Sequence, residues 1–256
     1  MDDAQYFPNY TLHLLGGGMQ YRKTWEWFDY HGFPLPSVMA IISTMGYHYI
    51  NEIIENTNYR GPNTDPIADL LIFDPLGIIV FSFDNVCQFF ASKVSFNDWN
   101  YQPAFSFSPL GLQNTGQNFV MKYPITASRT TSLMYHFGAF GELGLSFKTN
   151  NEDAVSVGVG MTSNQVFREF NSNGAPQFTI SVGPRAGIYW DRNNSLMASL
   201  VASDNLQSFL VFNLYPGVTF NKSYSPGFFM SVGKSGSFTF GITTSLLPLG
   251  VSTKKP

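Results

Sequence analysis

Residues 133–147 read LMYHFGAFGELGLSF, and this stretch decides the fold class. Its odd positions carry apolar or small side chains, whereas its even positions are for the most part polar or glycine. Because successive side chains of a β-strand point to opposite faces, the alternation predicts one long strand with an apolar and a polar face. The pattern recurs in later segments, and a membrane-crossing strand needs roughly 9–11 residues. We therefore expect a mainly β protein with a transmembrane antiparallel β-barrel over residues 101–256.

Turn-forming residues separate nine such segments, which are 104–109, 118–125, 132–148, 153–163, 177–191, 195–203, 208–220, 227–234 and 237–246. Bacterial single-chain barrels have even strand numbers, so we expect eight or ten strands. The polar face is rich in Gly, Ser and Thr, which leaves room in the lumen for N-terminal residues or lets the strands coil tightly. A soluble sandwich also alternates, but its strands average about 5–6 residues, which favours the membrane barrel.

Two further segments are expected to lie outside the strands. Residues 168–175 form the longest polar connection, which is typical of an extracellular loop, and residues 249–256 are expected to form a tail that contacts a partner. The first residues, MDDAQ, have neither a positively charged start nor an apolar core, so no secretory signal is visible. An outer-membrane protein must be exported, and we therefore expect that a leader has been removed.

The composition supports a membrane location. Only 12% of the residues are charged, against about 25% in ordinary soluble domains, while 44% are hydrophobic and 16% aromatic. The mean hydropathy of −0.03 is what averaging an apolar with a polar face gives, and no run approaches the roughly 18 apolar residues of a membrane-spanning helix. A net charge of −3 without a basic cluster excludes nucleic-acid binding. The single Cys87 excludes an internal disulfide and a CxxC pair.

Residues 1–100 follow a helical period instead. Residues 10–30 are loosely helical, a second helix runs from about Ser37 with apolar residues three and four apart, and a third begins at Thr64 or Asp65. Asp74-Pro75 should kink or restart this third helix, which continues to about Lys93. These helices are too apolar for water and too broken to span a bilayer. We expect them to pack on each other, on the barrel end, at the membrane interface or in the lumen.

The densest polar group on these helices comprises His48, Glu52, Glu55, Asp65, Asp69 and Asp74. His48, Glu52 and Glu55 are four and three residues apart and share one helix face, an arrangement that a metal site or an acid/base pair uses. The alternative is structural: Asp65 caps a helix, Glu52 and Asp69 accept hydrogen bonds, and Glu55 faces solvent. No recognised metal spacing is present, so neither a metal nor a cofactor is predicted.

His136 lies on the polar face of its strand with Ser132 and Glu142, which makes a Ser-His-acid catalytic set conceivable. Six residues of one strand separate His136 from Glu142 by roughly 20 Å, so the two side chains should not touch. Arg185 is the expected partner of Glu142. His13 stands beside Gly16–Gly18, but the phosphate-loop pattern is missing and close helix packing is the preferred interpretation.

The N-terminal region, over about residues 9–80, resembles an uncharacterised family of Bacteroidetes-type Gram-negative outer-membrane proteins. The matching positions are Asn9, His13, Gly17, Tyr21, the helix end Asn51-Glu52-Ile53-Ile54-Glu55, the run Thr64-Asp65-Pro66-Ile67-Ala68-Asp69-Leu70, and Asp74-Pro75-Leu76-Gly77. Leu14 replaces a proline of the family and Asp74 an asparagine. A related Glu and Asp-Leu arrangement occurs in small membrane proteins similar to the glycopeptide-resistance accessory family. The resemblance implies an outer-membrane address and no established activity.

These patterns favour a non-enzymatic outer-membrane protein: a scaffold or accessory subunit of an envelope complex, or a binder of lipid or another apolar ligand. Outer-membrane lipid and partner proteins are the expected contacts. The alternative is a lipid-modifying enzyme of the acyl hydrolase or transferase type that uses His136 or the His48, Glu52 and Asp69 group. A passive pore ranks lower because the barrel is small and the helices offer a plug.

Overall fold

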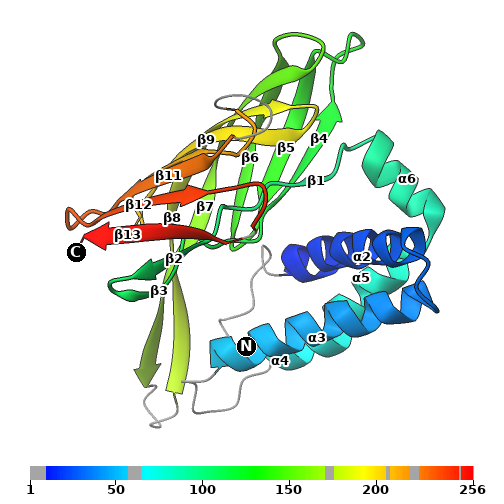
Figure 1. The fold of residues 1–256 in the computed structure, drawn as a ribbon, viewed down its shortest axis with the longest axis horizontal. Coiled ribbons are helices and arrows are strands. Elements are labelled where there is room, and N and C mark those ends of the chain that lie inside the picture. The colour runs from blue at the N-terminus through cyan, green and yellow to red at the C-terminus, as the bar shows by residue number, and fades with distance from the viewer. Residues whose placement is uncertain are drawn as a thin grey trace. The chain divides into compact units, whose positions relative to one another are not determined.

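The computed structural model describes residues 10–56, 65–170, 176–205, 208–218, 225–247 and 249–255, with only the backbone described at 54–56, 65, 164–170 and 176–180 (Figure 1). The chain is mainly β, with 42% strand and 31% helix. It forms two units: Met1–Phe90 with Val166–Ile180, and Ala91–Gln165 with Ser181–Pro256. The first unit holds most of the helical residues and the second most of the strands.

The helical elements are η1 (Leu12–Gly17), α2 (Gly18–Tyr30), α3 (Pro36–Asn56), α4 (Asp65–Ala68), η2 (Asp69–Phe73), α5 (Asp74–Phe81) and α6 (Asp84–Ser92). The two η elements are π-helical, a wider form that often occurs at functional sites. Helix α5 begins at Asp74-Pro75, as the proline predicted. The prediction that this helix continues to about Lys93 is wrong. It ends at Phe81, and α6 is bent by 87° from the preceding helical segment.

Helix α3 is polar where it is buried and apolar where it is exposed. Its buried residues, Ala40, Thr44, His48 and Glu52, recur at every fourth position and so form one stripe. Its exposed large side chains are Val38, Met39, Ile41, Ile42, Tyr47, Tyr49, Ile50 and Ile53. Among the described helices, no single one is both long and apolar enough to cross a membrane, although Pro66–Phe81 and Asp84–Ser92 meet that criterion as a bent pair.

Glycines bring α2 and α5 into backbone contact. A Cβ atom added to Gly77 would lie 2.4 Å from the carbonyl oxygen of Leu14 and 3.1 Å from the amide nitrogen of Gly18. A Cβ atom on Gly18 would lie 2.8 Å from the carbonyl oxygen of Gly77. Backbone atoms cannot retreat from such a contact as a flexible side chain can. The close packing that the glycine run predicted is therefore found at Gly18.

Replacing Gly77 with alanine should destabilise the helical unit. The added methyl group overlaps backbone atoms of the facing helix, and overpacking of this kind costs about 1–3 kcal/mol. Gly46→Ala in α3 is the matched control, because a Cβ atom there meets nothing within 4 Å and alanine favours the helix by roughly 0.5–1 kcal/mol. Thermal unfolding followed by circular dichroism in detergent should show a lower Tm for G77A only. Equal midpoints for the two variants would contradict the close contact.

Thirteen strands in the described part of the chain form one large open mixed sheet in the order β1-β4-β5-β6-β7-β8-β9-β10-β11-β12-β13-β2-β3. They are β1 (Asn97–Asp98), β2 (Ala104–Phe107), β3 (Leu110–Gln113), β4 (Phe119–Pro124), β5 (Thr131–Phe137), β6 (Phe140–Lys148), β7 (Asp153–Phe170), β8 (Pro176–Arg192), β9 (Ser195–Ser203), β10 (Leu210–Leu214), β11 (Gly227–Val232), β12 (Phe238–Thr243) and β13 (Gly250–Lys255). Strands β13 and β2 run parallel, and every other pair whose register is described is antiparallel.

Several sequence predictions about the strands need correction. The expected count of eight or ten is wrong, partly because the single strand predicted over 132–148 is the hairpin of β5 and β6. Residues 250–255, expected to lie in a tail, form β13 inside the sheet order. Residues 168–170, expected in a loop, extend β7, and 171–175 lie outside the described residues. Among the described strands, only β7 and β8 exceed ten residues, so strand length no longer separates a membrane barrel from a sandwich.

Segment 97–107 pairs with both ends of the series of strands that runs from β4 to β13. Strand β1 pairs with β4, and β2, which follows it after five residues, pairs with β13. Backbone hydrogen bonds continue between these strands. The amide groups of Trp99 and Tyr101 donate to the carbonyl groups of Asn118 and Gly116, and the Gly250 amide donates to Pro103. The segment 97–107 is therefore bonded to β4 at its start and to β13 at its end.

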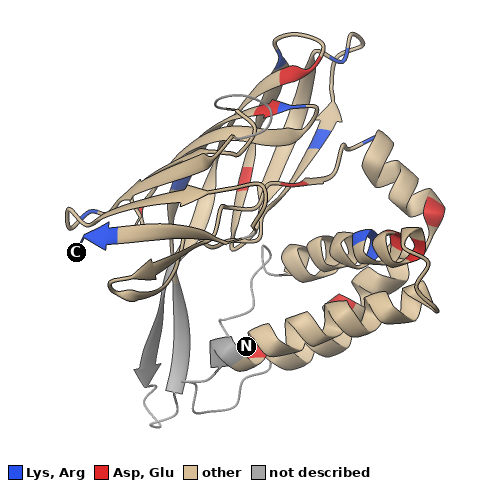
Figure 2. Cartoon of the chain, viewed as in Figure 1, with Lys and Arg blue, Asp and Glu red and all other residues tan. Residues whose placement is uncertain are grey.

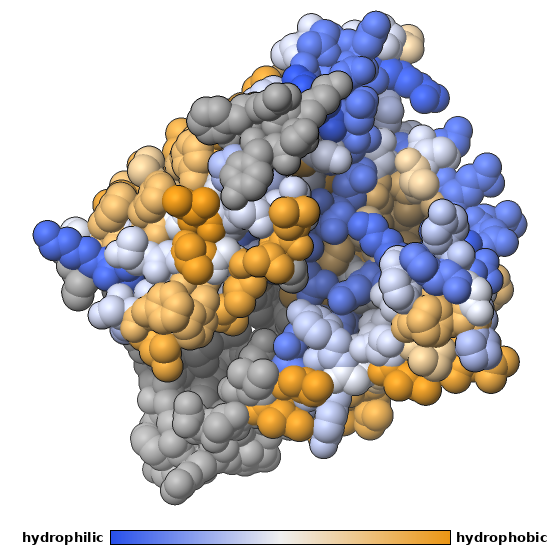
Figure 3. All heavy atoms as spheres, viewed as in Figure 1, coloured by the Kyte–Doolittle hydropathy of each residue, from blue (hydrophilic) through white to orange (hydrophobic). Residues whose placement is uncertain are grey.

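The two faces of the sheet differ in polarity. The buried face carries a small apolar cluster around Trp99, Met134 and Tyr189 together with many polar side chains. These buried polar residues include Lys122, His136, Glu142, Ser146, Ser156, Arg185, Asp191, Ser199, Asn213 and Thr239. Large apolar side chains are exposed on the other face, among them Leu133, Leu143, Phe147, Val157, Val159, Met161, Ile188, Leu200, Met230 and Ile242. Figure 3 shows apolar side chains gathered over the strands, and Figure 2 shows few charges along them.

Candidate functional site

Four helical segments bring five titratable side chains together in the first unit. His13 comes from η1, His48 and Glu52 lie one turn apart on the buried stripe of α3, Asp69 is the first residue of η2, and Asp74 is the first residue of α5. Four of the five, all but His13, are buried. Residues separated by up to 61 positions in the sequence thus form one polar cluster inside an apolar group of helices.

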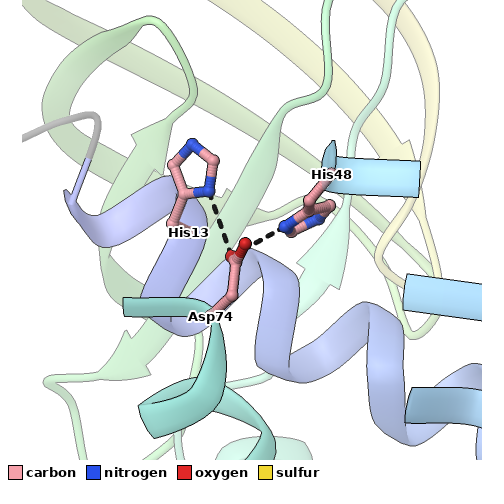
Figure 4. A group of neighbouring side chains, drawn as sticks. All are labelled: His13, His48 and Asp74. Carbon is pink, nitrogen blue, oxygen red and sulfur yellow. Dashed lines mark hydrogen bonds and ion pairs between the residues drawn. The ribbon is translucent and has the colours of Figure 1, made fainter. Parts of the chain in front are cut away.

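Asp74 stands between the two imidazoles (Figure 4). Its Oδ1 atom lies 3.0 Å from Nδ1 of His13 and 2.7 Å from Nδ1 of His48. The other ring nitrogen of His13, Nε2, lies 3.5 Å from Oδ2 of Asp69. The side chains of His48, Asp69 and Asp74 are 5%, 1% and 1% exposed. His13 therefore bridges two buried carboxylates, and Asp74 is shared by two histidines.

Glycine is required beside this cluster. A Cβ atom on Gly17 would lie 2.9 Å from Cε1 of His48 and 3.3 Å from Oδ1 of Asp74. The absence of a side chain at this position lets the helix that carries His13 approach the other two residues. Gly77, one turn after Asp74, makes the backbone contact with Gly18 described above. The two glycines thus fix the spacing of the helices that carry the cluster.

The carboxylates control the charge of His13. Burial of the ring lowers the pKa of His13, but the hydrogen bond to Asp74 and the nearby charges of Asp69, Asp74 and Glu52 outweigh it. The pKa of His13 is consequently raised above its ordinary value of about 6.5. Oδ2 of Asp74 is buried and has no hydrogen-bond partner in the part of the chain that the structure describes. The cluster therefore attracts positive charge, and Oδ2 of Asp74 is an acceptor atom that no described residue uses.

The structure brings together most of the polar group expected on the helices. His48 and Glu52 share the buried face, and Asp69 and Asp74 join them. The side chains of Glu55 and Asp65 lie outside the described residues. Tyr21 is buried, but its hydroxyl group accepts a hydrogen bond from Ser82 instead of meeting the cluster.

His13 is a member of the cluster that the sequence pattern did not predict. No spacing rule links a residue of η1 to one of α3, and only the contact of the folded segments reveals the pair. The glycine run after His13 was the available signal, because it marked the segment as one that packs closely against another helix.

A second polar cluster lies on the buried face of the sheet, around Glu142. Its carboxylate accepts hydrogen bonds from Nδ1 of His136 at 2.9 Å, from Nε of Arg185 at 3.0 Å and from the hydroxyl group of Tyr189. Arg185 also donates to the hydroxyl oxygen of Tyr101 at 2.7 Å. The predicted pairing of Arg185 with Glu142 is confirmed.

The prediction that His136 and Glu142 cannot touch is wrong. The chain reverses direction between Phe137 and Phe140, so the two residues face each other on β5 and β6 as direct register partners. Ser132 remains four residues from His136 along β5, about 13 Å at the rise of a strand, so a Ser-His-acid set is not assembled from these three residues. His136 and Glu142 are 1% and 0% exposed, which leaves a substrate no access and indicates a structural role.

Comparison of the chain with protein-family models, with curated proteins and with solved structures finds no match. The resemblance of residues 9–80 to a family of outer-membrane proteins therefore stays a prediction. The chemistry of the two clusters and the polarity of the sheet faces carry the functional argument.

Glu142→Gln should destabilise the sheet unit strongly. The substitution leaves the buried guanidinium of Arg185 without its carboxylate, and breaking a buried ion pair on one side costs about 3–5 kcal/mol. Glu152→Gln is the matched control, because Glu152 is exposed in the turn before β7. Unfolding of both variants in guanidinium, followed by tryptophan fluorescence, measures the difference. A Glu142→Gln protein as stable as the control would show that the network contributes little.

Proposed function

We propose that this protein is a non-enzymatic integral β-barrel of the cell outer membrane. It acts as a scaffold or accessory subunit of an envelope complex, or binds lipid or another apolar ligand. The inverted polarity of the sheet carries the proposal. In membrane barrels the outward face is apolar and the interior is polar, whereas a soluble sandwich has the reverse arrangement.

Strands β6 and β7 illustrate the inversion within one register. Leu143 and Val159 are direct partners and are 60% and 68% exposed, whereas the pair Ser146 and Ser156, three positions further along the two strands, is buried and joined by a hydrogen bond of 2.9 Å. Apolar surface in water costs roughly 25 cal/mol per Å². Contiguous exposed apolar patches larger than a few hundred Å² mark interaction sites. A hydrocarbon environment removes this cost for the whole outward face.

The pairing of segment 97–107 supports closure of the sheet into a barrel. An open sheet in a membrane would leave edge amide and carbonyl groups without partners, and each unsatisfied group there costs several kcal/mol. This segment bonds to β4 at one end and to β13 at the other. The same stretch of chain thereby covers both edge strands, β4 and β13, of the series from β4 to β13.

The filled interior disfavours a passive pore. Trp99, Tyr189, Met134 and His136 are among the largest fully buried side chains. Lys122 forms a buried ion pair of 2.5 Å with Asp191. An interior filled by side chains leaves no aqueous channel, whereas the wide lumen of a porin stays open to water.

The exposed apolar side chains of the helical unit support a second contact with lipid or with an apolar partner. Trp27, Tyr30, Ile42 and Leu71 are each more than half exposed. Helices of this composition lie in membrane interfaces with their apolar side chains among the acyl chains. This surface is the one to which a lipid, an apolar ligand or a partner subunit would bind.

Val159→Arg tests the membrane location of the sheet. Arginine on the lipid face near the bilayer midplane costs about 2–4 kcal/mol, whereas a surface substitution in a soluble protein stays within about 0.5 kcal/mol. Asn151→Arg, in the exposed turn before β7, is the control. Guanidinium unfolding from phosphatidylcholine vesicles should show a loss of stability for Val159→Arg only. Equal stability of the two variants, or a wild-type protein that stays in the aqueous phase, would refute the membrane barrel.

A lipid-modifying enzyme is the alternative. The assembled cluster of His13, His48 and Asp74 is a better candidate for its active site than His136 is. A non-enzymatic protein predicts that envelope lipids analysed by mass spectrometry are the same with and without the protein. An altered acyl or headgroup pattern that Asp74→Asn abolishes and His31→Ala preserves would establish the enzyme instead. His31 is the suitable control because it is exposed and its ring makes one described hydrogen bond, to the carbonyl oxygen of Trp27.

A further inference from the structure

Three donor atoms of types that bind transition metals converge in the helical cluster. His13, His48 and Asp74 come from three different helical segments, and each offers one donor atom that lies within 4.8 Å of the other two. Ligands around a tetrahedral zinc ion at about 2.0–2.2 Å are about 3.4 Å apart. The observed separations from Asp74 Oδ1 are 3.0 and 2.7 Å. Small side-chain rotations, without movement of the helices, would open the space for an ion.

Asp69 holds His13 in the orientation that such a site needs. In metal sites the ring nitrogen that does not bind the metal usually donates to a carboxylate, which fixes the tautomer and the ring plane. Here Nδ1 of His13 faces Asp74 and His48, while Nε2 faces Oδ2 of Asp69 at 3.5 Å. His13, Asp69 and Glu52 also form a second close group. Two carboxylates thus flank the three converging donors.

The cluster also has an unused acceptor. Oδ2 of Asp74 is buried, belongs to a side chain that is 1% exposed, and has no hydrogen-bond partner among the described residues. A buried carboxylate oxygen without a donor costs more than a hydrogen bond contributes. Nδ1 of His48 is also buried, lies 2.7 Å from Asp74 Oδ1, and does not complete a hydrogen bond of good geometry. A cation between these atoms would satisfy both.

The charges lead to the same conclusion. Asp69, Asp74 and Glu52 place three carboxyl groups together in a buried place beside two imidazoles. One divalent ion supplies two positive charges to balance carboxylates there, and neutral imidazole is the form of histidine that binds metals. Imidazole and carboxylate donors together suit Zn²⁺ and neighbouring divalent ions better than Ca²⁺ or Mg²⁺.

We propose that His13, His48 and Asp74 bind one divalent transition-metal ion, with Zn²⁺ favoured by the donor set, and that Asp69 positions His13 for it. The site ties η1, α3 and α5 together. The proposed site depends only on contacts inside the helical unit, so it can be tested independently of the membrane location of the sheet.

The test uses the full-length, tag-free protein in detergent after treatment with a chelator. Co²⁺ titration followed by visible absorption, with Zn²⁺ competition, should give one equivalent of bound metal. His48→Gln and Asp74→Asn keep the side-chain size and should weaken binding at least 100-fold. Asp69→Asn should weaken it about 10–100-fold, as expected for an orienting carboxylate. His31→Ala, the exposed histidine of the same unit, should bind like wild type.

Far-UV circular dichroism of each metal-free variant shows whether it is folded. A folded wild-type protein that binds no Co²⁺ or Zn²⁺ would overturn the proposal, and so would a folded His48→Gln protein that binds as tightly as His31→Ala. If His48→Gln does not fold, the comparison of Asp69→Asn with wild type decides. Unchanged metal affinity of Asp69→Asn would show that Asp69 does not position His13, and the proposed arrangement would then be wrong.

Discussion

Gly18 of α2 and Gly77 of α5 meet with no side chain between them, and the arrangement of the helical cluster depends on this contact. Asp74 precedes Gly77 by one turn, so the same approach that joins the backbones brings its carboxylate to the segment that carries His13. Gly17 leaves the space that the ring of His48 occupies. Small residues in the helices thus determine where charged residues can meet, and the charged residues determine the chemistry.

The sheet unit depends in the same manner on one carboxylate. Glu142 accepts hydrogen bonds from His136, Arg185 and Tyr189, which come from β5 and β8. Each hydrogen bond in this network lowers the cost of burying a charged carboxylate, although Nε2 of His136 is buried and has no hydrogen-bond partner among the described residues. The network also fixes the register, because a shift by one residue would turn every one of these side chains to the apolar face.

The alternation of apolar and polar residues predicted the mainly β composition and the strand over 195–203, which matches β9 in both bounds. The turn inside 132–148 could not be seen, because Gly138 and Ala139 fit the alternation as well as they fit a tight turn. Residues 250–255 have little apolar character and acquire strand structure only from their neighbours β12 and β2. Spacing placed His48 and Glu52 on one face, but it carried no information about His13, whose position depends on contacts distant in the sequence.

The parallel pairing of β2 with β13 also constrains the order of assembly. Most neighbouring strands of this unit are consecutive in the chain and can pair as soon as both are present. Strand β2 is made early, yet its parallel partner is the last strand described. Loop-closure entropy makes so distant a contact slow to form. Until then, both partners present unpaired edges to which other chains can add, so the growing sheet needs protection for as long as its final strand is missing.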